Sequence, residues 1–297
     1  MRLPRSLVRA AARAKPVVPE RAWPLLLALR SLPGDGALIG EPRLHSVVVL
    51  APHPDDESLG CGGTVALLRG RGASVRVAFA TDGESTRGAA LSADETRRRR
   101  RSEALAACGQ LGVAAADVGF WGLPDGGLAA STHEIVPLIE SAVAETRADG
   151  LFLPWFLDGH ADHEALNAAL ASATLPPGLE VWGYETWSPL IANRIVDVST
   201  VWARKEAAVA AHVTARLAFD VEATLGLNRW RSIHGLMGRG YAEAFLAAPI
   251  REYLATAVLA RDLPSAAPRP AAPGPGAPRP SAPGPAAPGS AAPSGST

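Results

Sequence analysis

The sequence predicts an α/β fold in which a mainly parallel sheet carries helices on both faces. Between residues 46 and 198, short apolar runs alternate with longer helical stretches, an order that is typical of parallel sheets. The chain has 297 residues, of which 47% are hydrophobic, so it is long enough to bury one large core. The sequence shows no internal repeat of fixed period. These observations indicate one α/β domain.

The expected elements follow one another in regular order. The first strand is Ser46–Leu50, because a run of β-branched residues can fill both faces of a buried parallel strand. The later strands are similar short apolar runs, expected at residues 74–80, 118–121, 150–154, 180–184 and 195–198. The stretches between them have helical composition, and the expected helices are residues 59–71, 94–111, 133–146 and 163–173. Such sheets bind ligands at the carboxyl ends of their strands, so the loops there are the first candidates for a site.

Composition changes on both sides of residues 40–262, which we take as the folded domain. Residues 1–39 are predicted to form a helical extension that packs on the domain rather than lying on a membrane surface. Basic residues interrupt any signal-peptide core there, and no apolar run approaches the roughly 20 residues of a membrane span. Residues 263–297 are nearly all Pro, Ala, Gly and Ser, which predicts a disordered tail.

Charge and cysteine content limit the partners that the protein can have. The 29 basic and 29 acidic residues cancel, so net charge favours neither nucleic acid nor an anionic membrane. The arginines at 97–101 open an expected helix, and we interpret them as a solvated helix face. Cys61 and Cys108 cannot supply a disulfide framework, which favours a cytoplasmic location. A small-molecule substrate is the expected partner.

The loop after the first strand is rich in possible metal ligands. It reads Ala51-Pro52-His53-Pro54-Asp55-Asp56-Glu57. His53 and Asp56, three positions apart, can grip a borderline cation such as Zn²⁺. Adjacent acids in a buried turn repel one another unless a cation or hydrogen-bond donors are present. On its own the motif also fits a polar turn in which an aspartate caps the following helix.

A dinucleotide site is the rival interpretation of this region. Gly60-Cys61-Gly62-Gly63 follows the first strand, and Asp82 ends the second, as in nucleotide-binding α/β proteins. However, the glycines come too late after the strand, Val65 takes the third glycine position, and the turn carries carboxylates that would repel a pyrophosphate. We therefore interpret the glycines as sites of close helix packing.

A second cluster follows the fourth strand and completes the predicted site. It reads Pro154-Trp155-Phe156-Leu157-Asp158-Gly159-His160-Ala161-Asp162-His163. His160 and His163 provide one imidazole for a metal and one free imidazole, with a carboxylate nearby to fix its tautomer. Because both clusters come at strand ends of one sheet, we expect them to converge on one metal ion.

Together these motifs resemble the PIG-L/LmbE-like zinc-dependent N-deacetylases, which act on N-acetylglucosaminyl compounds. The resemblance covers about residues 45–250 and rests on His53-Pro54-Asp55-Asp56-Glu57, His160-Ala161-Asp162-His163, Thr81-Asp82-Gly83-Glu84, residues 101–112, 122–126 and 184–189. It implies a Rossmann-like α/β domain that binds zinc, or another divalent metal such as Fe²⁺, through His53, Asp56 and His163. Two positions depart from the family pattern: Ala161 replaces a proline, and residues 211–214 lack the usual glutamine, which leaves the role of His212 open.

The resemblance also implies a mechanism. Asp55 would act as general base, and protonated His160, oriented by Asp162, would stabilise the oxyanion formed when a zinc-activated water attacks the amide. Arg87 and Asp125 fall where the family places substrate-binding groups. The expected reaction is removal of an N-acetyl group from an amino-sugar conjugate. An amidase that cleaves a larger N-acyl group, such as a thiol conjugate, and an inactive sugar-binding module are the alternatives.

Overall fold

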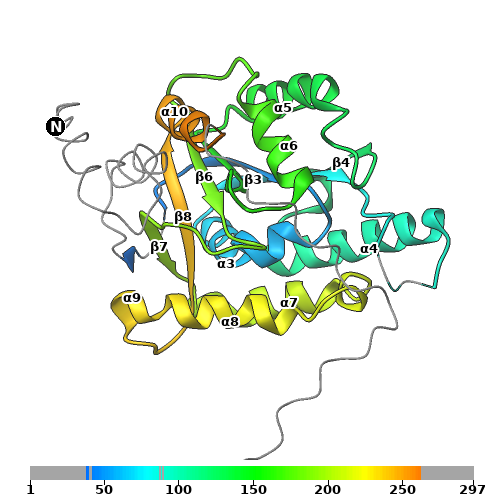
Figure 1. Ribbon diagram of the computed structural model, residues 1–297. Helices are drawn as coiled ribbons and strands as arrows, with labels where there is room; N and C mark the ends of the chain where they lie inside the picture. The colour runs from blue at the N-terminus through cyan, green and yellow to red at the C-terminus, as the bar shows by residue number, and fades with distance from the viewer. Residues whose placement is uncertain (1–37, 40–41, 87, 89, 262–297) are drawn as a thin grey trace, which may run out of the picture. The chain divides into compact units, whose positions relative to one another are not determined.

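A single mixed sheet forms the centre of the fold in the computed structural model, which describes residues 38–39, 42–86, 88 and 90–261 (Figure 1). The strand order within these residues is β1-β7-β8-β6-β5-β2-β3-β4. All neighbouring pairs are parallel except the two that β8 makes with β6 and β7. The strands are β1 Leu38–Ile39, β2 Ser46–Ala51, β3 Ser74–Thr81, β4 Val118–Leu123, β5 Gly150–Pro154, β6 Glu180–Tyr184, β7 Arg194–Asp197 and β8 Ala242–Pro249. The predicted α/β fold with a mainly parallel sheet is confirmed.

Helices cover both faces of this sheet, as predicted (Figure 1). One face carries α5, α6 and α10, and the other carries α3, α4, α7 and α8. The described helices are α3 Asp56–Gly70, α4 Ala93–Leu111, α5 Thr132–Thr146, α6 Ala161–Leu170, α7 Trp202–Ala211, α8 Val221–Arg231, α9 Ile233–Leu236 and α10 Ile250–Arg261. None of them combines the length and hydropathy that crossing a bilayer requires.

The central strand β2 shows why the apolar run Ser46–Leu50 becomes a buried strand. Val47 and Val49 pack into the core under α3 and α4, whereas Val48 and Leu50 pack into the core under α5 and α6. Each of these four side chains is at most 1% exposed. A strand buried on both faces needs apolar residues at every position, which is what the sequence supplies.

Most predicted elements agree with the structure, and the differences lie toward the C-terminus. β5 and β6 have the predicted bounds, and α3 begins at Asp56, earlier than expected. The prediction missed β8 and the helices from α7 onward. The predicted helical extension and the tail fall outside the described residues, apart from the two residues of β1, which form a strand rather than part of a helix.

The order of the strands places the loops that carry the two sequence clusters side by side. From β2 the chain moves through β3 to β4 on one side, and it then returns to place β5 on the other side of β2. Open α/β sheets bind ligands where the strand order reverses in this way. The loops after β2 and β5 are therefore neighbours at the carboxyl edge of the sheet.

Candidate metal centre

The turn after β2 brings His53 and Asp56 together. The backbone N–H of His53 donates to Oδ2 of Asp56 over 2.9 Å, which closes the turn. The same oxygen lies 3.2 Å from Nδ1 of the His53 ring. The three-residue spacing thus folds the carboxylate back onto the imidazole at the start of α3, as the sequence predicts.

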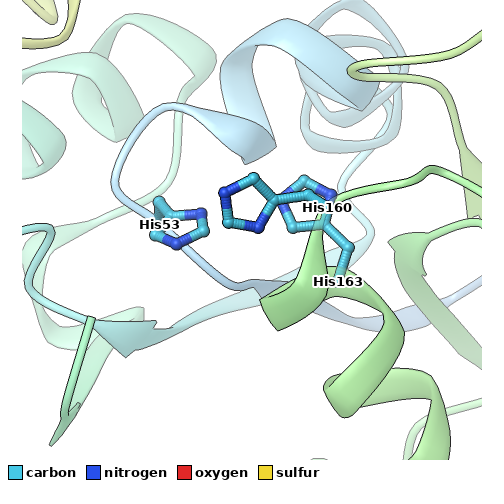
Figure 2. A group of neighbouring side chains, drawn as sticks. All are labelled: His53, His160 and His163. Atoms are coloured by element: carbon cyan, nitrogen blue, oxygen red, sulfur yellow. The ribbon is translucent and has the colours of Figure 1, made fainter. Parts of the chain in front are cut away.

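The start of α6 supplies the two other imidazoles. His160 is the N-cap residue of α6, and its Nδ1 accepts a 3.3 Å hydrogen bond from the backbone N–H of Asp162. His163 is fully buried one turn into the helix, with Nε2 3.3 Å from Oδ2 of Asp56. One ring nitrogen from each of His53, His160 and His163 lies within 4.8 Å of the others (Figure 2). The structure therefore gathers the three predicted ligands and the predicted oxyanion stabiliser in one place.

Carboxylates stand behind both candidate ligand histidines. Nε2 of His53 lies 3.1 Å from Asp162 and 3.2 Å from Asp125. Nδ1 of His163 lies 2.8 Å from Asp158. A carboxylate in this position holds the proton on the rear nitrogen and leaves the other nitrogen free for a metal. The nitrogens left free, Nδ1 of His53 and Nε2 of His163, are the two that face Asp56.

The Asp162 side chain does not make the contact with His160 that the sequence predicts. Its carboxylate accepts hydrogen bonds from the backbone N–H groups of Gly126 and Leu128 and contacts His53, whereas only its backbone N–H contacts His160. The reason is helical geometry, because the N-cap ring of His160 lies over the first turn while the Asp162 side chain points toward the loop after β4. The Asp162 carboxylate thus contacts the ring of His53 rather than that of His160.

The electrostatics of the site favour a cation. Burial alone would lower the pKa of His163, but the charges of Asp56 and Asp158 raise it to about 9. Burial acts in the same direction on His53, and contacts with Asp125, Asp162 and Asp56 raise its pKa well above the usual value. Among the described residues, both ring nitrogens of His163 are buried without a hydrogen bond, although carboxylate oxygens of Asp56 and Asp158 lie within 3.3 Å of them. Imidazole nitrogens and carboxylate oxygens grouped in this way fit a divalent metal.

Asp55 lies beside the candidate ligands and has a different partner. Its carboxylate forms a 3.1 Å ion pair with Arg100 of α4, whose guanidinium also donates to the carbonyl of Pro54. Burial raises the pKa of Asp55 to about 6, although the charge of Arg100 opposes this rise. A carboxyl group with a pKa near neutrality can both accept and return a proton.

His160 is half-buried, and its surroundings favour the neutral ring. Burial lowers its pKa, and the nearby His163 and His53 lower it further. Because Nδ1 accepts the Asp162 N–H, the proton of the neutral ring lies on Nε2. The ring can therefore donate a hydrogen bond without carrying the positive charge that the sequence interpretation assumed.

Of the two predicted substrate-binding residues, the structure places one. Asp125 lies in the site, 3.2 Å from the ring of His53, and it accepts the backbone N–H of Ser85. Arg87 lies outside the described residues. Trp187 borders the site with 50% of its surface exposed, and its ring lies 6.1 Å from that of His160, whereas Trp155 is buried.

Sequence reasoning missed two residues that contact the site. Asp158 had no distinguishing signal, since an aspartate in a loop before the His160-Ala161-Asp162-His163 cluster is equally typical of a solvated turn. Arg100 did have one, because it falls on the buried stripe of α4, formed by Thr96, Arg100, Ala104, Ala107, Cys108 and Leu111. The interpretation of residues 97–101 as a solvated face is therefore wrong for Arg100, which is 5% exposed.

Comparison with known proteins identifies the family. Residues 48–174 match the PIG-L family model, described as GlcNAc-PI de-N-acetylase. The chain is 30% identical over 201 residues to diacetylchitobiose deacetylase of Thermococcus kodakarensis, covering 59% of this chain and 72% of that protein. This chain belongs to the PIG-L family.

Two further proteins are similar to this chain. The chain is 32% identical over 163 residues to 2'-N-acetylparomamine deacetylase of Streptomyces fradiae, covering 48% of this chain and 57% of that protein. The crystal structure of the conserved protein TT1542 from Thermus thermophilus superposes with a TM-score of 0.56 at 31% identity, over 68% of this chain and 93% of that one. The family match over residues 48–174 includes both clusters of the candidate metal centre.

Proposed function

We propose that this PIG-L protein is a metal-dependent deacetylase that hydrolyses the N-acetyl group of an amino-sugar conjugate. The observation that carries the proposal is the convergence of His53, Asp56 and His163, with the paired carboxylate of Asp55 beside them. The names of the two relatives, an N-acetylparomamine deacetylase and a diacetylchitobiose deacetylase, support an N-acetylated amino sugar as the substrate class.

The metal would be held by Nδ1 of His53, Oδ2 of Asp56 and Nε2 of His163. We favour zinc because two imidazoles and one carboxylate with a position left for water are typical of catalytic zinc sites. When bound there, zinc supplies an activated water and polarises the amide carbonyl. Asp162 and Asp158 keep the two imidazoles in the tautomers that this arrangement needs.

The remaining steps belong to the chain's own side chains. Asp55 accepts the proton of the attacking water and returns it to the leaving amine, while Arg100 holds its carboxylate in place. His160 donates from Nε2 to the oxygen of the former amide carbonyl, on which negative charge develops. Asp125 and Arg87 are proposed to bind hydroxyl groups of the sugar, and for Asp125 its place beside His53 supports this role.

A cytoplasmic location is also part of the proposal. Cys61 and Cys108 are both buried and free, which suits a reducing compartment.

Acetate release tests the proposed function. Purified protein is incubated with N-acetylglucosaminyl glycosides and conjugates, with and without a chelator, and free acetate is measured. We expect release from at least one substrate, loss on chelation and recovery on addition of Zn²⁺. Acetate release that persists in the metal-free protein would contradict the proposal.

A further inference from the structure

Helix α3, which begins with the candidate metal ligand Asp56, is interrupted near its start. Cys61 has non-helical angles (φ −141°, ψ 15°), so a short first segment from Asp56 to Gly60 is set off from the rest of α3. In a regular helix, the N–H groups of Gly63 and Thr64 would donate to the carbonyls of residues 59 and 60. The interruption loosens that link between the short segment and the body of the helix.

Two buried side chains of opposite charge occupy the interruption. Nζ of Lys205 in α7 donates to the carbonyl of Leu59 over 2.7 Å, on the side of the short segment. Glu243 of β8 accepts the backbone N–H groups of Gly63 and Thr64 over 2.8 and 2.7 Å, on the other side. Lys205 and Glu243 also pair with each other over 2.6 Å, and both side chains are 0% exposed.

The signs of these charges match the two helix ends that they contact. A cation is favoured at the C-terminal end of a helical segment and an anion at an N-terminal end. Lys205 meets the end of the short segment, and Glu243 meets the start of the longer one. A fully buried ion pair is costly to desolvate and adds little net stability, so its placement at this break points to a role in local geometry.

A second residue at the end of α7 contacts the same short segment. His212, the C-cap residue of α7, places Nε2 2.9 Å from Oε1 of Glu57. The other oxygen of Glu57 accepts the backbone N–H of Asp55 over 3.1 Å. Lys205 and His212 are seven residues apart, which is two helical turns, so they project from one face of α7. Between them Val209 packs in one apolar cluster with Leu59.

We propose that Lys205, His212 and Glu243 form a clamp that sets the position of Asp55 and Asp56 in the metal-binding turn. Lys205 fixes the carbonyl end of the short segment, Glu243 anchors the helix behind it, and His212 acts through Glu57 on the backbone of Asp55. The three are positioning residues, because among their described contacts none is with a candidate ligand atom. Any effect of these residues on the rate of deacetylation rests on the proposed function. Their effect on the position of Asp55 and Asp56 does not.

The test compares full-length variants by hydrogen–deuterium exchange of residues 55–59 in the metal-free protein and by Zn²⁺ affinity. Lys205→Met and His212→Leu should speed exchange in this segment and weaken Zn²⁺ binding about 10- to 100-fold, the effect usual for residues that orient metal ligands. His212→Gln keeps a donor that reaches Glu57 and should restore most of the affinity lost in His212→Leu.

Ile139→Ala is the matched control for general destabilisation, because Ile139 is fully buried in α5 on the opposite face of the sheet. It should lower the melting temperature without changing exchange at 55–59. The clamp is overturned if Lys205→Met and His212→Leu behave like Ile139→Ala, or if His212→Gln and His212→Leu are equally impaired. A wild-type protein that binds Zn²⁺ but releases no acetate contradicts the proposed function and leaves the clamp intact.

Discussion

Two adjacent carboxylates at the head of α3 have different surroundings, and this difference separates their proposed roles. Burial raises the pKa of Asp55 to about 6, even with Arg100 beside it. Asp56 is buried too, but His163 and His53 hold its pKa well below the usual value. A permanently ionised carboxylate suits a metal ligand, and one that titrates near neutrality suits a proton carrier.

Asp55→Asn tests this division of roles. The amide cannot accept the water proton, so we expect turnover to fall by about 10²–10⁴-fold, the usual contribution of a general base. Metal content, measured by mass spectrometry, should stay at the wild-type value because the substitution leaves the three ligands unchanged. Wild-type turnover in this variant would show that another group takes the proton.

Arg100→Met tests the partner of Asp55 through the pH dependence of kcat/KM. The charge of Arg100 lowers the pKa of Asp55, so its removal should raise that pKa. The base works only when ionised, and activity is lost as pH falls through its pKa. The acidic limb of the pH profile should therefore move to higher pH. If the acidic limb stays where it is in the wild type, the ionisation that it reports is not that of Asp55.

At the scale of single residues, the sequence was enough to predict the candidate metal ligands and the candidate base, but not all of the residues that contact them. His53, Asp56 and His163 stand out because they follow strand ends, where parallel sheets gather functional groups. Glu243 reaches the turn that supports the site only through a tertiary contact, from β8 to α3. Asp158 lies five residues before His163, but the order of residues does not show that its carboxylate turns toward that ring. No local spacing records such contacts.

At the scale of elements, α3 must pass very close to the sheet. A Cβ atom added to Gly60 would lie 2.1 Å from the ring of Tyr184, and one added to Gly63 would lie 2.6 Å from Val198. Tyr184 cannot move easily, because it is fully buried and its hydroxyl donates to the carbonyl of Leu50. The interpretation of the glycines after the first strand as sites of close helix packing is confirmed for Gly60 and Gly63, whereas a Cβ added to Gly62 would make only an ordinary contact at 3.5 Å.

Gly60→Ala should consequently destabilise the protein by about 1–3 kcal/mol, as overpacked core substitutions do. Gly109→Ala in α4 is its matched control, since a Cβ there meets nothing within 4 Å. That change should stabilise the protein by roughly 0.5–1 kcal/mol through helix propensity. Urea denaturation measures both, and equal effects of the two substitutions would refute the packing argument.

The elements that escaped prediction share a physical reason. β8 reads Ala-Glu-Ala-Phe-Leu-Ala-Ala-Pro, which is rich in residues that do not favour strands, and it inserts antiparallel between β6 and β7. Its strand conformation comes from pairing on both sides and from Glu243 meeting the interruption of α3. Both are long-range effects that local propensity does not contain.

At the scale of the whole molecule, the alternation of strands and helices was enough to predict the layered fold. The order of the strands was not predictable in the same way, because it depends on which neighbour each strand finds after its crossover. That order matters for the proposed function, since it makes β5 the neighbour of β2 and so brings the two clusters together.

Truncation of residues 263–297 tests the domain organisation. This segment is nearly all Pro, Ala, Gly and Ser and offers no side chain that the proposed chemistry needs. We expect the truncated protein to keep its metal content, melting temperature and turnover. Loss of turnover with unchanged metal content would assign the tail a part in substrate binding.

Metal content of matched histidine variants tests the central claim most directly. After loading with Zn²⁺ and gel filtration, the wild type should hold one equivalent per chain. His133→Ala should hold the same, because the His133 side chain is 80% exposed on α5. His163→Ala should hold almost none. A full equivalent of zinc in His163→Ala would contradict the metal centre on which the account depends.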